Sequence, residues 1–258
     1  GAHVLPFAFG SGGNGKGVLL EAVSGVLGDY ATTAPVGFLM AQLHSGHETE
    51  IARLAGTRMV LCSEVNEGDR FDEAKVKQLT GGDTLTARFM RQDHFSFRPT
   101  HQLWLMGNHK PEVRSGGRAF WRRLRLIPFL NEVPDERVIE DLQNVLVAEH
   151  GGALLAWSGA GAGAYTTGGL REPTSVRAAT DEYAKEQDSV ARFIEECCLV
   201  GGGDEVKIRM SRVWETFERW CAAGGEQPIT RKAFGLALRN RFGVGEERTN
   251  SARFYVGL

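Results

Sequence analysis

The sequence predicts an α/β protein built around a parallel β-sheet, and two observations support this fold class. Short, nearly uninterrupted apolar runs lie at residues 4–9, 57–63 and 101–107, as expected of strands that are covered on both faces. Helical patterns at 16–28 and 72–82 separate these runs, and such alternation favours parallel strands joined by helical crossovers. The pattern therefore indicates a sheet with helices on both of its faces.

The middle of the chain continues this pattern with one interruption. Residues 84–99 form two alternating runs around a polar tip at 91–94, which is typical of a β-hairpin inserted between the second helix and the third strand. A further strand is expected at 124–130. The Gly/Ala-rich segment 158–169 has the composition of a linker, with a weak helix as the alternative. Helical spacing then resumes over 173–198.

The C-terminal part predicts two helices followed by a hairpin. The helices are expected at 211–225, with Ser211 as N-cap, and at 230–243, with Thr230 as N-cap. The hairpin is expected within 245–258, and helix, helix and β-wing is the order of a winged-helix module. The sequence thus predicts three segments: a core over 1–157, a helical linker or lid region over 158–200, and a winged-helix-like domain over 201–258.

Composition excludes several classes of protein. The formal net charge is −2, so any nucleic-acid surface must be a local patch. No stretch reaches the ~18 consecutive apolar residues of a membrane span, and the N-terminus lacks a signal-peptide layout. A cytoplasmic protein is therefore expected, and the abrupt first strand suggests a piece of a longer chain. Cysteines that lack metal-ligand spacing predict buried, reduced thiols: Cys62, Cys197, Cys198 and Cys221.

A glycine-rich pattern, Gly10-x-x-x-x-Gly15-Lys16, lies between the first predicted strand and the first predicted helix. Glycines allow backbone N–H groups to converge on phosphate oxygens, and the lysine reaches the outer phosphates of a nucleotide. The pattern therefore predicts a nucleotide site formed by Gly10, Gly12, Gly13, Asn14, Gly15, Lys16, Gly17 and Val18.

Gly17 stands where such loops usually carry a Ser or Thr whose hydroxyl binds Mg²⁺. Without that hydroxyl, Mg²⁺ depends on phosphate oxygens, waters and a carboxylate from elsewhere. Glu64, directly after the second buried run, is the first candidate for the metal ligand or for polarising an attacking water. Glu67 is the second candidate.

Two further features lie near the same predicted sheet edge. Asn108 follows the third strand, where its amide would orient a water or sense the γ-phosphate, although asparagine at a strand end is equally a turn former. A group of arginines precedes the strand at 124–130. It is either a solvated face or the source of an arginine that stabilises phosphoryl transfer in a neighbouring subunit. Its members are Arg118, Arg122, Arg123 and Arg125.

Four motifs in this order resemble the helicase part of phage/plasmid-type primase-helicases, which are superfamily 3 AAA+ motors related to the poxvirus primase-helicase. They are "GSGGNGKGVLLEAVSGVLGDYA" (10–31), "VLCSEVNEGDRFDEAKVKQLTGGDTLTARFMRQDHFSFRP" (60–99), "LWLMGNHKP" (103–111) and "FWRRLRLIPF" (120–129). The resemblance is strong over 4–130 and extends toward 258. It implies a AAA+ P-loop core that uses ATP and Mg²⁺, a hexameric ring with ATP between subunits, and primase and collar domains ahead of the motor.

The resemblance also implies roles for single residues. Lys16 would be the Walker A lysine, Glu64 the Walker B acid and metal ligand, and Asn108 the sensor. Arg122, with Arg123, would be the finger that reaches into the site of the next subunit. Besides Gly17, the chain departs from related viral helicases at Ser63, where these often carry a second acid next to the Walker B glutamate.

In this family a hairpin ahead of the sensor strand projects into the central channel and carries basic residues to DNA. The 84–99 hairpin has that place, so Arg91 at its tip is the first expected DNA contact, with Arg88 and His94 beside it. Lys77 lies where the family often has another basic residue facing DNA. Independently, residues 226–258 carry a net charge of +3, which either contacts DNA phosphates or belongs to a domain that braces the ring.

The predicted function is an ATP-dependent DNA helicase domain of a phage or mobile-element replication protein, acting on single-stranded or forked DNA in a bacterial host. Two alternatives stay open. Gly17 and the single acid at Glu64 would fit a decayed motor that serves as a nucleotide-gated or structural DNA-binding ring. A small-molecule kinase could use the same loop, but the hairpin and the C-terminal segment fit it poorly.

Overall fold

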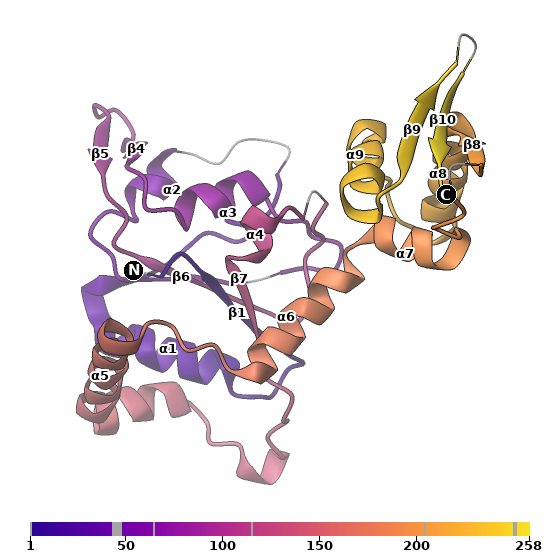
Figure 1. The fold of residues 1–258 in the computed structure, drawn as a ribbon. Coiled ribbons are helices and arrows are strands. Elements are labelled where there is room, and N and C mark those ends of the chain that lie inside the picture. Colours follow the sequence, from indigo (N-terminus) through magenta and orange to yellow (C-terminus); the bar gives the residue numbers. More distant parts are fainter. Residues whose placement is uncertain (1, 43–47, 64, 115, 204, 250–251) are drawn as a thin grey trace. The chain divides into compact units, whose positions relative to one another are not determined.

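The computed structural model describes residues 2–42, 48–63, 65–114, 116–203, 205–249 and 252–258. Contacts divide the chain into unit 1, Gly1–Tyr183, and unit 2, Ala184–Leu258 (Figure 1). This division differs from the three predicted segments. The predicted middle segment, 158–200, is split between the two units, because its first part packs with the N-terminal core and its last helix packs with the C-terminal core.

The sheet of unit 1 has five described strands, all parallel, in the order β2-β3-β6-β1-β7. Four of them coincide with the predicted apolar runs: β1 (Leu5–Phe9), β3 (Met59–Cys62), β6 (Gln102–Gly107) and β7 (Leu124–Pro128). The fifth, β2 (Ala31–Thr33), is a short and only half-buried edge strand. It has no apolar run, which is why its sequence does not predict a strand.

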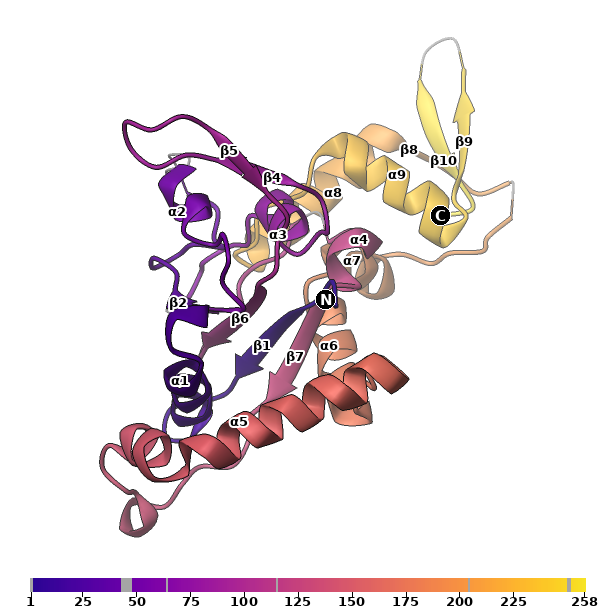
Figure 2. The ribbon, with the colours of Figure 1, turned by 90° about the vertical axis from the view of Figure 1, so that its left-hand side faces the viewer.

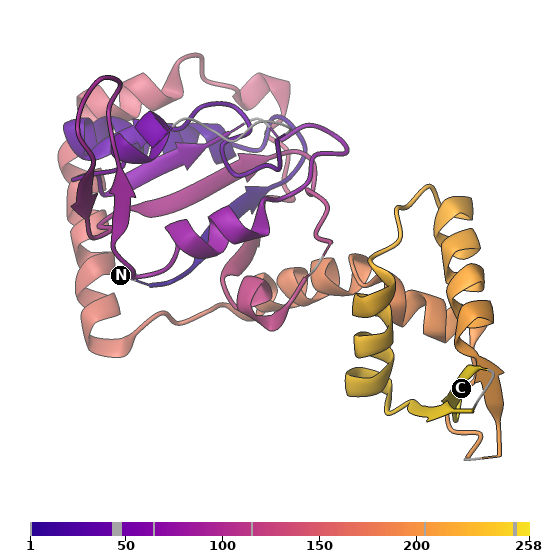
Figure 3. The ribbon, with the colours of Figure 1, turned by 90° about the horizontal axis from the view of Figure 1, so that it is seen from above.

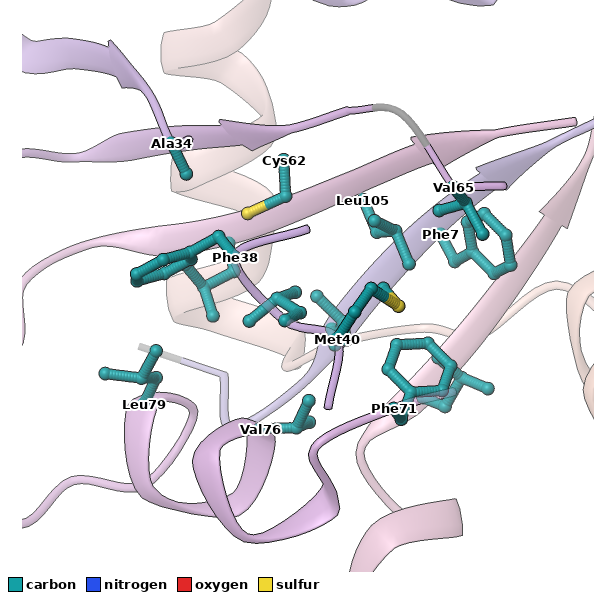
Figure 4. Close-up of a cluster of buried hydrophobic side chains, with 14 of the residues drawn as sticks. Phe7, Ala34, Phe38, Met40, Cys62, Val65, Phe71, Val76, Leu79 and Leu105 are labelled. Atoms are coloured by element: carbon teal, nitrogen blue, oxygen red, sulfur yellow. The ribbon is translucent and has the colours of Figure 1, made fainter. Parts of the chain in front are cut away.

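Successive residues of the central strands enter two different cores, as the alternation of a strand requires. Phe7 and Leu105 face the larger core, where Figure 4 shows them gathered with Val65. Their neighbours Ala8 and Met106 face the opposite side of the sheet. Because both faces are covered, the strands read as continuous apolar runs rather than as alternating ones.

Helices cover the two faces of the sheet, as Figures 1 and 2 show. On one face α1 (Lys16–Leu27) packs against α5 (Leu142–Gly168), and a Cβ on Gly25 would lie only 2.8 Å from Val147. Helix α5 extends to Gly168, so segment 158–169 is helix except for its last residue, which is the alternative that the sequence left open. The other face holds α3 (Glu73–Leu79) and α4 (Arg118–Trp121). Shorter helices are η1 (Gly28–Tyr30), α2 (Glu48–Ala52) and η2 (Asp135–Arg137).

Helix α6 (Thr174–Glu186) begins beside the edge strand β7. The hydroxyl of Thr180 accepts a hydrogen bond from the backbone N–H of Leu126 at 2.9 Å, which satisfies a donor that the sheet leaves unpaired. The buried Tyr183 hydroxyl donates to the carbonyl of Pro111. These contacts tie α6 to unit 1 as far as Tyr183.

The predicted hairpin is present. Its strands β4 (Leu85–Ala87) and β5 (Phe95–Phe97) are antiparallel and lie next to α2 (Figure 2). Leu85 and Ala87 face inward while Thr86 is exposed, so the hairpin is attached to unit 1 by one face only.

Unit 2 contains the helices α7 (Ser189–Cys197), α8 (Met210–Ala223) and α9 (Arg231–Phe242) beside three antiparallel strands (Figure 3, orange to yellow). The strands β8 (Lys207–Arg209), β10 (Arg253–Val256) and β9 (Gly245–Arg248) are ordered β8-β10-β9. Aromatic rings form the centre of the core, with Phe217 and Phe234 stacked at 4.5 Å and Phe193 edge-on to both.

Two predicted caps have different outcomes in unit 2. The Thr230 hydroxyl accepts from the backbone N–H of Ala233 at 3.3 Å, so it is the N-cap of α9. Ser211 is not a cap, because α8 already begins at Met210 and Arg209 is in the N-cap position. The backbone of β8 runs directly into the helix, which removes the turn that a capping serine would serve.

All four cysteines are free, but the prediction of burial is correct for only two of them. Cys62 and Cys221 are buried, and burial raises the pKa of the Cys62 thiol to about 12. Cys197 is exposed and Cys198 is half-buried. The described residues contain no cluster of three or more His, Cys, Asp or Glu side chains suited to a metal ion, and no helix among them could cross a membrane.

We expect Phe7→Ala to lower the free energy of unfolding by about 3–5 kcal/mol, because the ring is fully buried in the larger core. Phe89→Ala, in which a half-exposed ring stacks on Phe95, should cost about 1 kcal/mol or less. Urea denaturation followed by circular dichroism checks both values. Equal losses for the two variants would contradict the assignment of the core.

Candidate functional site

A cavity of about 790 Å³ lies at the carboxyl ends of strands β1, β3 and β6. Its walls come from residues 13–18, from the segment after β3 and from the end of β6. Strand β6 lies between β1 and β3, so three chain segments that are far apart in the sequence reach one sheet edge there. Ligands of open parallel sheets bind at such an edge.

The glycine loop, residues 10–17, has a backbone that only glycines adopt easily. Gly13 and Gly15 have φ angles of 68° and 77°, and Gly15 lies in the N-cap position of α1. Among the described residues, the backbone N–H groups of Gly13, Gly15, Gly17 and Val18 donate to no acceptor. The loop therefore presents free donors to the cavity at the positive end of a helix.

Contacts with the segment after β7 hold the loop in this shape. A Cβ on Gly10 would lie 2.2 Å from the carbonyl oxygen of Phe129, so no other residue fits there without a shift of backbone. The amide of Asn14 donates to that same carbonyl at 3.1 Å, and the N–H of Val133 donates to Gly13 at 2.8 Å. Ser11 also donates to Glu132 at 3.0 Å. Asn14 thus braces the loop from within.

The Lys16 side chain is buried against the loop, with 8% of its surface exposed. Its ammonium donates to the carbonyls of Gly10 at 3.1 Å and Ser11 at 2.7 Å, and to Asn14 Oδ1 at 3.3 Å. Burial lowers the pKa of Lys16. Within the described part of the chain no carboxylate pairs with this ammonium, so its charge is compensated by neutral oxygens alone. Such a cation is suited to an anionic ligand.

The structure brings several predicted site residues together around this cavity. Asn108, directly after β6, lines it with Lys16, Gly17 and Val18, and Glu67 lines it from the segment after β3. Gly10 and Gly12 are not part of the lining, and Gly10 instead supports the loop. The first candidate acid, Glu64, lies outside the described residues.

Glu21 and His109 also line the cavity, although sequence reasoning singled out neither. Glu21 belongs to the second turn of α1, where an acid normally indicates a solvated helix face. The sequence spacing could have indicated that Glu21 faces the cavity. Glu21 follows Gly17 by four residues, and residues i and i+4 lie on the same face of a helix. His109 follows Asn108 at the end of β6.

The predicted arginines lie outside the cavity lining, with Arg118 at the start of α4 and the other three after this helix. Arg122 is exposed and has no partner in the described part of the chain. Arg123 is half-buried and donates to the carbonyl of Ala119 at 2.5 Å. Arg125 forms an ion pair with Glu172 at 2.8 Å. Of the four predicted arginines, Arg125 alone pairs with a carboxylate among the described residues, and Arg118 and Arg122 are the two exposed ones.

The predicted DNA-contact residues of the hairpin also differ in whether an acidic side chain contacts them. Arg91 lies exposed at the tip with a φ angle of 61°, and it pairs with no acid in the ranges described. Arg88 and His94 both approach Glu48 of α2, at 2.7 and 3.3 Å, so one carboxylate is in contact with both side chains and compensates the charge of Arg88. Lys77 is half-buried on α3.

Unit 2 compensates part of its positive charge internally. Arg239 pairs with Glu246 at 3.6 Å, and Arg241 pairs with Asp188. The remaining basic residues of the predicted patch are exposed: Arg231, Lys232, Arg248 and Arg253. The acids of the segment are paired as well, Glu226 with Arg192, Glu247 with Lys207 and Glu246 with Arg239. The unpaired charge among the described residues of 226–258 is therefore positive and no smaller than the net charge of +3.

Two family models match separate parts of the chain. Residues 8–123 match a family described as "Family of unknown function (DUF5906)", and residues 185–254 match one described as "Poxvirus D5 protein-like". The first match covers most of the cavity lining, and the second covers most of unit 2.

The chain resembles replication proteins of large DNA viruses. It is 34% identical to a putative helicase of Acanthamoeba polyphaga mimivirus over 48% of this chain and 13% of that protein. It is 25% identical to a putative helicase of Frog virus 3 over 92% of this chain and 26% of that protein. A putative primase of African swine fever virus is 25% identical over 83% of this chain and 24% of that protein. The chain thus spans about a quarter or less of these relatives.

A solved structure shares the fold. The apo structure of the NrS-1 C terminal region has a TM-score of 0.53 to this chain at 11% identity, covering 100% of this chain and 66% of that one. At this identity the likeness concerns the fold alone. The viral relatives carry the functional resemblance.

We expect Gly10→Ala to lower the free energy of unfolding by about 1–3 kcal/mol, because the added methyl group collides with the carbonyl of Phe129. Gly12→Ala is the matched control. A Cβ at Gly12 meets nothing within 4 Å, so its cost should stay within about 0.5 kcal/mol. Urea denaturation of both variants checks the difference, and a silent Gly10→Ala would contradict the described bracing of the loop.

Proposed function

We propose that this chain is the ATP-dependent helicase domain of a viral-type replication primase-helicase, which couples ATP hydrolysis to movement on DNA. One observation carries the proposal: free loop N–H groups, the amide of Asn108 and the ammonium of Lys16, which no described carboxylate pairs, share one cavity at the sheet edge. The viral relatives named as helicases and primases support it. A phage or mobile-element origin and a bacterial host stay predictions, since these relatives come from viruses of eukaryotic hosts.

The cavity residues suit the charge distribution of a nucleoside triphosphate. The N–H groups of Gly13, Gly15 and Gly17 would donate to phosphate oxygens, and Lys16 would exchange carbonyl oxygens for the outer phosphates. Asn108 would orient the attacking water, with Glu64 or Glu67 to polarise it. Mg²⁺ bound with the nucleotide would neutralise phosphate charge during phosphoryl transfer.

The remaining parts of a motor come from the family resemblance. A hexameric ring would allow the exposed Arg122, with Arg123 beside it, to approach the nucleotide of a neighbouring subunit. The hairpin would line the central channel and carry Arg91 to single-stranded or forked DNA. Unit 2, with two helices followed by a hairpin, would act as a winged-helix-like domain, and primase and collar domains would precede the motor in the longer protein.

In this proposal Lys16→Ala lowers the ATP turnover of the longer, ring-forming protein by at least about 100-fold, because the charge on the outer phosphates is lost. Lys185→Ala, which removes an exposed lysine of α6, should keep wild-type turnover. The measurement is phosphate release with single-stranded DNA present. Equal turnover by wild type and Lys16→Ala would reject the mechanism.

The alternative is a motor that has lost catalysis and keeps nucleotide-gated or structural DNA binding. Gly17, which removes the usual Mg²⁺ ligand, is the observation that favours it. Calorimetry with ATP and Mg²⁺ on the assembled oligomer separates the two functions. Tight binding without hydrolysis supports the alternative, whereas binding followed by turnover supports the motor.

We expect Arg91→Ala to weaken DNA binding and to lower the salt slope by about 1 for each phosphate contact that is lost. Arg88→Ala should have a smaller effect, because Glu48 already compensates that guanidinium at 2.7 Å. Fluorescence anisotropy with labelled single-stranded DNA at several salt concentrations measures both. A larger loss for Arg88→Ala than for Arg91→Ala would contradict the assignment of the tip.

A further inference from the structure

Glu21 is an acid in the wall of a cavity that is otherwise built for an anion. It projects from the second turn of α1 and lines the cavity together with Lys16 and Gly17. The side chain is exposed and forms no hydrogen bond or ion pair within the described ranges. Its carboxylate is therefore not explained by the packing of unit 1.

The position of the carboxylate relative to Gly17 is specific. A Cβ added to Gly17 would lie 3.6 Å from Oε1 of Glu21 and 3.8 Å from the sulfur of Met106, with no closer neighbour. A Ser or Thr at position 17 would carry its hydroxyl one bond beyond that Cβ. The carboxylate oxygen of Glu21 thus lies next to the place of the missing hydroxyl.

The Glu21 carboxylate would lie close to the phosphates of a bound nucleotide, so their electrostatic interaction determines its possible role. A carboxylate beside bound phosphates repels them, and a cation that lies between the two offsets this repulsion by attracting both. Carboxylate and phosphate oxygens together are the ligands that Mg²⁺ prefers, usually with several waters retained. The donor set around Gly17 therefore fits Mg²⁺ without a hydroxyl.

We propose that Glu21 takes the place of the missing loop hydroxyl and holds Mg²⁺ against the phosphates of the bound nucleotide, directly or through one water. The proposal rests on the proposed nucleotide site. It assigns to α1 a metal-holding residue that the loop pattern does not contain, and it removes the main argument for a decayed motor.

The test compares ATP binding in the presence of Mg²⁺ and in the presence of EDTA by calorimetry, with Mn²⁺ retention on the ATP complex followed by electron paramagnetic resonance. The variants are Glu21→Gln, Glu67→Gln and the double variant Gly17→Ser with Glu21→Gln. Glu67→Gln tests the competing candidate for the metal ligand, because Glu67 lines the same cavity from the segment after β3. Circular dichroism melting checks that each variant is folded.

Glu21→Gln should reduce the Mg²⁺-dependent part of ATP affinity and the Mn²⁺ affinity by at least about tenfold. ATP affinity in EDTA should be unchanged or higher, because repulsion of the phosphates has been removed. Gly17→Ser in the double variant should restore part of the metal dependence, since the serine fits at ordinary contact distances. Glu67→Gln should have a smaller effect than Glu21→Gln.

Two results would overturn the inference, and they are distinguishable. If wild type binds ATP with a Mg²⁺ dependence that Glu21→Gln leaves intact, Glu21 does not hold the metal while the nucleotide site stands. If wild type binds no ATP in either condition, or binds it as well after Lys16→Ala, the proposed function fails and the inference fails with it.

Discussion

The close approach of Gly10 to the carbonyl of Phe129 is the constraint on which the site depends. The shape of the glycine loop comes both from hydrogen bonds within the loop and from the segment that follows β7. Asn14 donates to the same carbonyl, and Lys16 donates to the carbonyls of Gly10 and Ser11. One carbonyl at the end of an edge strand thus helps to set the direction of the N–H groups that face the cavity.

The sheet explains why the other site residues converge. Strands β1, β3 and β6 are parallel neighbours, so the residues that follow them lie at one edge, and β6 places Asn108 between the loop and the segment after β3. The two cores on opposite faces keep these strands rigid. Charged groups at the edge are therefore positioned by buried side chains such as Phe7 and Leu105.

Much of this arrangement could be predicted from the sequence, because it depends on local patterns. Apolar runs predicted four of the five strands, alternation predicted the hairpin, and the glycine pattern predicted a loop between β1 and α1. Features that depend on distant partners could not be predicted. Glu48 lies 40 residues before Arg88, and 115 residues separate Asn14 from Phe129. The place of Glu21 in the cavity wall follows from the fold, because its sequence context is that of a solvated helix.

Strand β7 has a mechanical consequence for the site. It begins one residue after Arg123, it ends one residue before Phe129, and it is paired with β1 along its whole length. Arg123 and Phe129 therefore flank one fully paired strand of five residues. The position of the segment that follows α4 is thus coupled through β7 to the position of the carbonyl that shapes the glycine loop.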